Sequence, residues 1–361
     1  MRSNINPYFN RNTTFAIKGI AIIMMFVHHF FTFPSWWVKG VSYPAGQAWE
    51  YYLRDPLRLC VSIFCFLTGY FYFFTKHKNY KYSFKKILSV LMPFWFVYLL
   101  YSVIAVYATG YQYSLKEYLL EMFALYRPTM YFCWYINYYI ICMLLLPLCV
   151  RLMSKNIHSD LLLALVIYML PIGGIHLLSK EWNYGITENL LLFFPVTLVG
   201  YVFANYDLFK KVEVINNNLV KPKAINIFIC FSLLVLAPLC RNTEFGITII
   251  FSKSIYYHMC MDAVYSPIFI YACVRLFNII KFATLEKSLF FLGQKSMLMW
   301  FVSCIFFGNS KQFVQPLLYY PHHPVLVTVW GLLMCYVSAV ILDAVIEKIR
   351  TWGNIVYNKA L

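Results

Sequence analysis

The sequence predicts an all-α, polytopic integral membrane protein that folds as a single domain over residues 1–361. Of its residues, 61% are hydrophobic and only 12% are charged, whereas an ordinary soluble domain has roughly 25% charged residues. Apolar runs recur along the whole chain, and at about 17–22 residues each is long enough to cross a hydrocarbon core as a helix. No stretch between these runs is long enough to form a second domain.

We expect ten membrane-spanning helices, at residues 15–33, 57–74, 87–108, 130–150, 161–178, 189–204, 224–240, 257–277, 289–307 and 325–346. If the N-terminus is cytoplasmic, 20 of the 30 Lys and Arg residues fall in cytoplasmic segments and 9 in outer loops. Because cytoplasmic loops are enriched in Lys and Arg, both termini are expected in the cytoplasm. No small-residue cleavage site follows the first apolar run, so we expect it to remain as a helix.

The cysteines and the net charge exclude several classes of protein. Almost all of the 11 cysteines stand singly within apolar runs, so neither a metal site nor a complete disulfide framework is expected. The net charge of +16 comes from lysines scattered through short loops, rather than from one basic face that could bind nucleic acid. The charge therefore reports membrane topology, and the lipid bilayer is the expected partner.

The first apolar run, IKGIAIIMMFVHHF, follows the chain from Ile17 to Phe30 and contains two adjacent histidines. A helix turns about 100° per residue, so Lys18 and His29 differ by about 20° after three turns, whereas His28 lies about 80° from Lys18. Lys18 and His29 therefore share one stripe, with His29 roughly 16 Å deeper along the axis. An ionisable group inside a span is costly, which favours a functional role for His29. The alternative is a neutral histidine that forms a hydrogen bond between helices, and for His28 this structural role is favoured.

Three other charged residues lie in or beside predicted helices. Arg58 is at the outer end of the second helix by this topology, where it could contact a substrate or serve as an interfacial anchor paired with Asp55. Asp262, in the eighth helix, needs a partner because an isolated charge in a membrane is costly. Asp343, near the inner end of the tenth helix, is expected to be structural.

The first two helices resemble a known family. The Lys18 to His29 stretch resembles the first-helix signature of the acyltransferase-3 family of bacterial integral-membrane acyltransferases, a basic residue followed by ten residues and then histidine. Lysine here replaces the commoner arginine. The segment RLCVSIFCFLTGYFYF, from Arg58, is similar to the family's basic, Phe-rich second helix, with Thr68-Gly69 in place of a Ser-Gly pair.

Two later segments extend this resemblance over most of the chain. CWYINYYIICMLLLPL, from Cys133, resembles the family's Trp-aromatic helix, and FLGQKSMLMWFVSCIF, from Phe291, resembles its Leu-Gly-x-x-Ser helix. Ser303 stands where many relatives have a second histidine, so a role for that histidine does not transfer. In the loop before the third helix, Lys85 and Lys86 stand where relatives often have spaced arginines.

The resemblance implies an O-acetyltransferase of the bacterial inner membrane. The donor would be cytoplasmic acetyl-CoA or another acyl-CoA, and the acceptor a hydroxyl of a cell-surface polysaccharide or lipid-linked glycan, with no tightly bound cofactor. Lys18, Lys85 and Lys86 would bind the phosphates of the donor. The alternative for Lys85 and Lys86 is that they only follow the positive-inside rule.

The same resemblance assigns the chemistry to His29, either as a general base that takes the hydroxyl proton or as a transient acyl carrier. Arg58 would orient the acceptor or stabilise oxyanion charge, and His28 would pack against His29 or assist it. The alternative function is a transporter or flippase for a lipid-linked sugar. No paired interrupted segments of the kind expected in inverted-repeat transporters are evident, and a non-catalytic scaffold would leave the Lys18–His29 stripe unexplained.

Overall fold

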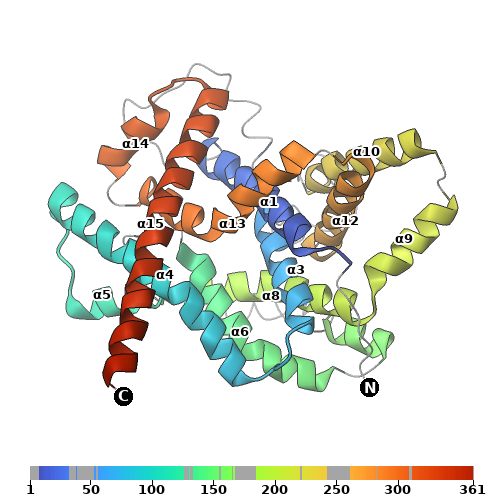
Figure 1. Cartoon of the computed structure of the whole chain (residues 1–361), viewed down its shortest axis with the longest axis horizontal. Helices are drawn as coiled ribbons and strands as arrows, with labels where there is room; N and C mark the ends of the chain where they lie inside the picture. The colour runs from blue at the N-terminus through green and yellow to red at the C-terminus, as the bar shows by residue number, and fades with distance from the viewer. Residues whose placement is uncertain are drawn as a thin grey trace.

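The computed structural model describes residues 8–31, 38, 53, 56–125, 130, 133–153, 156–164, 166, 184–219, 222–241, 261–281, 283–308 and 311–360. Over these residues the regular secondary structure is helical (Figure 1). The helices are α1 (Arg11–Phe31), α3 (Leu59–Phe73), α4 (Tyr80–Thr109), α5 (Leu115–Met122), α6 (Trp134–Leu152), α8 (Tyr184–Asn205), α9 (Leu208–Leu219), α10 (Lys223–Leu239), α12 (Asp262–Ile280), α13 (Ala283–Ile305), α14 (Lys311–Tyr319) and α15 (Pro324–Ala360).

The expectation of a multi-pass, all-helical protein is confirmed for the described residues. Six helices, α1, α4, α6, α12, α13 and α15, are long and apolar enough to cross a membrane, and α8 with α9 forms a seventh candidate that is bent by 66°. The apolar helices α3 and α10 are shorter. Nine of the ten expected ranges coincide with a described helix. Most of the range 161–178 lies outside the described residues, so the number of ten spans stays a prediction.

Some helices extend beyond the apolar run from which they were predicted, and others form where the sequence has no apolar run. Capping and amphipathic packing also determine where a helix forms. α4 begins at Tyr80 rather than at residue 87, since the Asn79 side chain accepts a hydrogen bond from the Tyr82 N–H at 3.0 Å. Lys85 and Lys86 therefore lie on a helix and not in the expected loop. The short helices α5, α9 and α14 were not expected at all.

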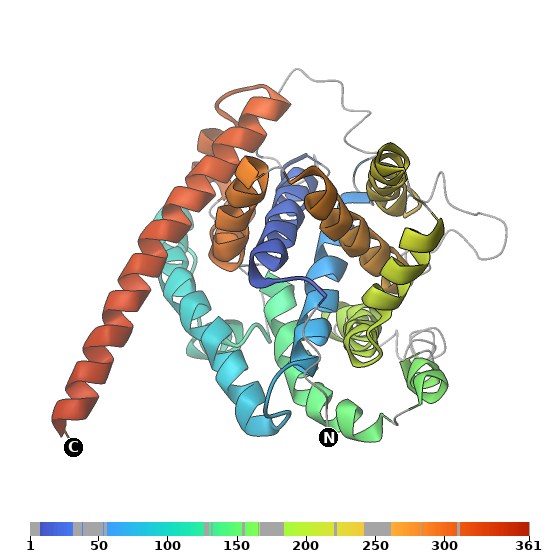
Figure 2. The ribbon, with the colours of Figure 1, turned by 45° about the vertical axis from the view of Figure 1, so that its right-hand side comes forward.

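α1 occupies the centre of the molecule (Figure 2). It packs against α13 on one side and also contacts α3, α12 and α15. α3 packs on α8, α10 packs on α12, and α15 runs along the outside of the bundle. The long helix α15 is the described span with the least of its apolar window buried inside the protein, 22%, which is consistent with a helix that faces lipid.

Glycines allow the central helices to approach very closely. A Cβ atom at Gly293 of α13 would lie 1.7 Å from the Phe15 carbonyl oxygen of α1, and one at Gly69 of α3 would lie 1.7 Å from the Thr197 carbonyl oxygen of α8. Small residues that let backbones touch are a common means of helix association in membranes. These two contacts hold α1 and α3, which carry the first two of the four segments that resemble the family, at fixed positions.

The Gly293→Ala variant tests this packing. Alanine is a better helix former than glycine by roughly 1 kcal/mol, yet we expect the variant to lose about 1–3 kcal/mol of unfolding free energy, because the new methyl group overpacks the α1–α13 interface. Denaturant titration in mixed micelles measures this difference. The neighbouring exposed residue Gln294 provides the control, since Gln294→Ala should be neutral; a Gly293→Ala protein of unchanged or higher stability contradicts the prediction.

Candidate active site

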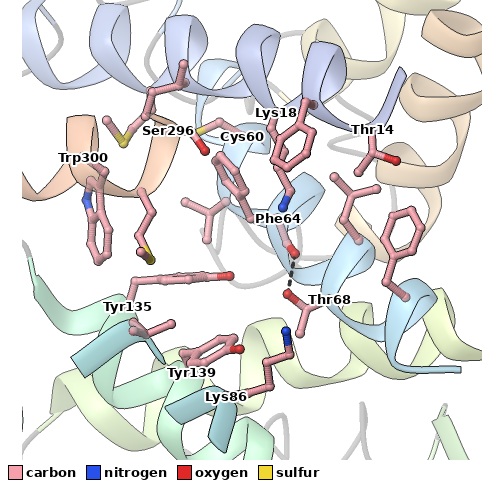
Figure 3. A pocket seen from close by; sticks show the side chains of 18 of the residues that line it. Thr14, Lys18, Cys60, Phe64, Thr68, Lys86, Tyr135, Tyr139, Ser296 and Trp300 are labelled. Atoms are coloured by element: carbon pink, nitrogen blue, oxygen red, sulfur yellow. Dashed lines mark hydrogen bonds between the residues drawn. The ribbon is translucent and has the colours of Figure 1, made fainter. Parts of the chain in front are cut away.

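A cavity of about 610 Å³ lies among α1, α3, α4, α6 and α13 (Figure 3). Most of its lining is apolar or aromatic. The polar and charged side chains that line it include Arg11, Thr14, Lys18, His29, Thr68, Lys86 and Ser296. The helices that carry three of the family-like segments, α1, α3 and α13, all contribute to its wall, and the fourth segment contributes Trp134, Tyr135 and Tyr139 of α6.

One stripe of α1 forms a whole side of the cavity. Lys18, Ile22, Met25 and His29 line it, and their spacing of three or four residues places them on one face of a helix. His28 is not among the lining residues; it is 6% exposed, and its ring centroid lies 5.4 Å from that of His29. Lys18 and His29 therefore line one cavity, whereas His28 is buried outside the cavity lining.

Two lysines face each other at one end of this cavity. Figure 3 shows Lys18 of α1 and Lys86 of α4 pointing toward one another, with Thr68 between them. Each ammonium lies against an aromatic ring, that of Lys18 at 5.4 Å from the Phe15 centroid and that of Lys86 at 5.6 Å from the centroid of its neighbour Tyr82. Among the residues that the structure describes, no carboxylate forms an ion pair with either lysine. Two facing cations in an apolar cavity favour an anionic ligand.

The sequence analysis did not identify Arg11 as a cation of the cavity, and it included Lys85, which does not line the cavity. Arg11 lines the cavity near this end, with its guanidinium carbon 5.5 Å from the Phe15 ring. Lys85 and Lys86 are both exposed, but only Lys86 is among the lining residues, because successive helical residues differ by about 100° in direction. An Asn at position 10, whose side chain accepts a hydrogen bond from the Thr13 N–H at 2.9 Å, was the signal that the helix begins early enough to include Arg11.

His29 lies at the other end of the stripe, roughly 16 Å from Lys18 along the helix axis. The His29 ring packs edge-on against the Phe307 ring, with the two ring centroids 6.2 Å apart. Met25 and Cys60 line the same cavity. Arg58 is at the N-cap of α3 and does not line the cavity. Asp55, the suggested partner of Arg58, lies outside the described residues.

Aromatic side chains form the wall opposite α1. Tyr135 of α6 packs edge-on against Trp300 of α13, with ring centroids 5.6 Å apart. Tyr139 lies one helical turn further along α6 (Figure 3). Large, rigid side chains in a close-packed wall keep a cavity open and well defined. The arrangement can therefore hold an elongated ligand that has an anionic end and an apolar body.

The two acidic residues singled out in the sequence both have partners. Arg241 Nε donates to Asp262 Oδ1 at 2.6 Å, and the Ser62 hydroxyl donates to Asp262 Oδ2. The side chains of Arg241 and Asp262 are only 2% and 0% exposed. Asp343 pairs with Lys295 at the α13–α15 contact. Neither pair is part of the cavity lining, which agrees with the structural role expected for Asp343.

No group of three or more His, Cys, Asp or Glu side chains that could hold a metal ion occurs within the described part of the chain. The functional groups that line the cavity include an imidazole, cations and hydroxyl groups beside an apolar wall. Such a set can bind an anionic ligand and can move a proton.

Comparison with known proteins identifies the family of the chain. No solved structure gives a significant match to the chain. The model of the acyltransferase-3 family, described as an acyltransferase domain, matches residues 16–344. This range contains Lys18, His29 and Lys86, together with all or part of every helix from α1 to α15. The chain therefore belongs to the acyltransferase-3 family of membrane acyltransferases.

Proposed function

We propose that the protein transfers an acetyl group from acetyl-CoA to a hydroxyl of a cell-surface polysaccharide or lipid-linked glycan. The observation that carries the proposal is one cavity with two lysines at one end, neither of which forms an ion pair within the described residues, and His29 at the other. Coenzyme A has phosphates at one end of a flexible arm and its thioester at the other. Lys18, Lys86 and Arg11 would hold the phosphates, and the arm would extend along the aromatic wall toward His29.

In this proposal His29 supplies the proton chemistry. The hydroxyl oxygen of the acceptor attacks the thioester carbonyl carbon while His29 takes the hydroxyl proton. The tetrahedral intermediate then collapses, the carbon–sulfur bond breaks, and the thiolate of coenzyme A leaves and takes the proton from His29. Arg58 would favour negative charge on the carbonyl oxygen as it develops. The other route, in which a His29 nitrogen first accepts the acetyl group, uses the same residues.

The proposal also implies an orientation of the protein in the membrane. The Lys18–Lys86 end would open to the cytoplasm of a bacterium, where acetyl-CoA is made, and both termini would lie on that side of the inner membrane. The distribution of Lys and Arg along the sequence supports this orientation. It places the donor and the extracytoplasmic acceptor at opposite ends of one passage, so the transfer step would occur inside the membrane beside His29.

Replacing a cavity lysine is expected to weaken donor binding. Hydrogen bonds to charged groups contribute about 1.5–3 kcal/mol, so Lys86→Met and Lys18→Met should each raise the dissociation constant for coenzyme A by about 10- to 100-fold. Isothermal titration calorimetry on the purified protein measures it. Lys85→Met is the matched control, since Lys85 is exposed like Lys86 but does not line the cavity, and it should change binding by less than about threefold.

Two results would reject the donor assignment. The first is a wild-type protein that binds no coenzyme A. The second is a Lys85→Met variant that loses as much affinity as Lys86→Met, since the effect would then come from the positive charge of the surface rather than from the cavity. The acceptor is tested separately, by comparing acetylation of surface glycans in cells with and without the protein.

A further inference from the structure

Three residues before α1, Tyr8, Phe9 and Asn10, form what we call the N-terminal strap. Phe9 lines the cavity and is only 3% exposed. Its ring stacks on Tyr70 of α3, with centroids 5.0 Å apart and an interplanar angle of 12°. Asn10 caps α1, and the cavity-lining Arg11 follows directly. The strap therefore forms part of the wall at the cationic end of the cavity.

A carboxylate outside the cavity holds the Tyr8 side chain of this strap, while the Tyr8 N–H donates to the Tyr70 hydroxyl at 2.9 Å. The Tyr8 hydroxyl donates to Oε2 of Glu213 at 2.8 Å, and the Tyr271 hydroxyl donates to the same oxygen at 3.1 Å. Arg275 of α12 forms an ion pair with Oε1 of Glu213. Glu213 belongs to α9, the helix that follows the 66° bend after α8, and it does not line the cavity.

The surroundings of Glu213 make it a fixed anchor. Arg275 Nη2 also donates to Asn217 Oδ1 at 2.7 Å and to Asn226 Oδ1 at 3.1 Å, so its guanidinium is held from α9 and α10 at once. Burial and the neighbouring Glu213 carboxylate raise the pKa of Tyr8, which keeps its phenol protonated as a donor. Hydrogen bonds to charged groups are among the stronger ones in proteins.

We propose that Glu213 is a positioning residue for the acyl-donor site, acting through Tyr8 to hold Phe9 and Arg11 in the wall of the cavity. The inference rests on the proposed function for the identity of the ligand, but the anchoring itself does not depend on it. Without the Tyr8–Glu213 hydrogen bond the strap keeps its ring contacts and the hydrogen bond from the Tyr8 N–H to the Tyr70 hydroxyl at 2.9 Å, but it loses its bond to α9, so the donor must order the strap further when it binds. Ordering costs free energy and lowers affinity.

The test compares two variants that each remove one phenol hydroxyl from the same carboxylate oxygen. Tyr8→Phe frees the strap, whereas Tyr271→Phe leaves the strap bonded to Glu213 and serves as the matched control. We expect Tyr8→Phe to raise KM for acetyl-CoA about five- to tenfold with kcat within about twofold of wild type. Tyr271→Phe should leave KM within about twofold. Amide exchange over residues 9–14 should be several-fold faster in Tyr8→Phe only.

The outcomes separate this inference from the proposed function. Unchanged KM and unchanged exchange in Tyr8→Phe overturn the role of the strap, and so do equal increases in both variants, which indicate a general loss of stability. A wild-type protein that neither binds nor uses acetyl-CoA rejects the proposed donor instead. In that case the exchange measurement still decides the anchoring: faster exchange in Tyr8→Phe alone supports it, and equal exchange in the two variants rejects it.

Discussion

Replacing His29 with alanine is expected to lower the rate of acyl transfer by about 10²–10⁴-fold, the usual contribution of a positioned general acid or base. If His29 instead carries the acyl group, the loss should be at least as large, because the covalent route disappears. In both cases kcat falls, while coenzyme A binding is expected to change little, since Lys18, which we propose binds the phosphates, lies roughly 16 Å away along α1. Transfer of labelled acetyl groups by membranes from cells that express each variant measures the rate.

The neighbouring histidine provides the control for this experiment. His28→Ala changes the same type of side chain one position earlier, but His28 lies behind the cavity and not in its wall. We expect that variant to retain transfer activity within about tenfold, with its main effect on packing. Full activity of His29→Ala at normal protein level contradicts the assignment, and so does a complete loss in His28→Ala at a normal level and fold.

The α1 side of the candidate site could be predicted because it depends only on helical geometry. Lys18 and His29 lie on one stripe whenever the segment is a helix, whatever packs against it. The same reasoning failed for Lys85 and Lys86, since it treated residues 75–86 as a loop. Once the Asn79 cap is recognised and α4 begins at Tyr80, the helical period separates the two lysines and selects one of them for the cavity.

Helix α9 and two polar contacts could not be predicted from the apolar runs of the sequence. α9 has a mixed composition, and its signal was the helical period of the sequence LFKKVEVINNNL rather than overall hydropathy. Glu213 contacts residues far away in the sequence, so its role depends on tertiary packing. The partner of Asp262 is a similar case, since nothing in the local pattern around Arg241 links the two residues. Their pairing requires α10 and α12 to lie side by side.

Removing the Asp262 carboxylate is expected to lower the free energy of unfolding by about 3–5 kcal/mol. In Asp262→Ala the Arg241 guanidinium, which is only 2% exposed, loses its ion pair, and the Ser62 hydroxyl loses its acceptor. A buried charge without its counter-ion is far more costly than a buried pair. Denaturant titration in mixed micelles measures the loss.

Two further variants test whether the loss of stability in Asp262→Ala comes from a buried charge that has lost its counter-ion or from a general sensitivity of the helix ends to substitution. Asp343→Ala removes the acid of the Lys295–Asp343 pair, whose Asp343 side chain is 39% exposed, and should cost less than about 1 kcal/mol because water compensates the freed lysine. The double variant Arg241→Met with Asp262→Leu removes both buried charges and should recover most of the stability lost in Asp262→Ala. If the double variant is no more stable than Asp262→Ala, the cost comes from lost packing at the α10–α12 contact and not from an unpaired charge.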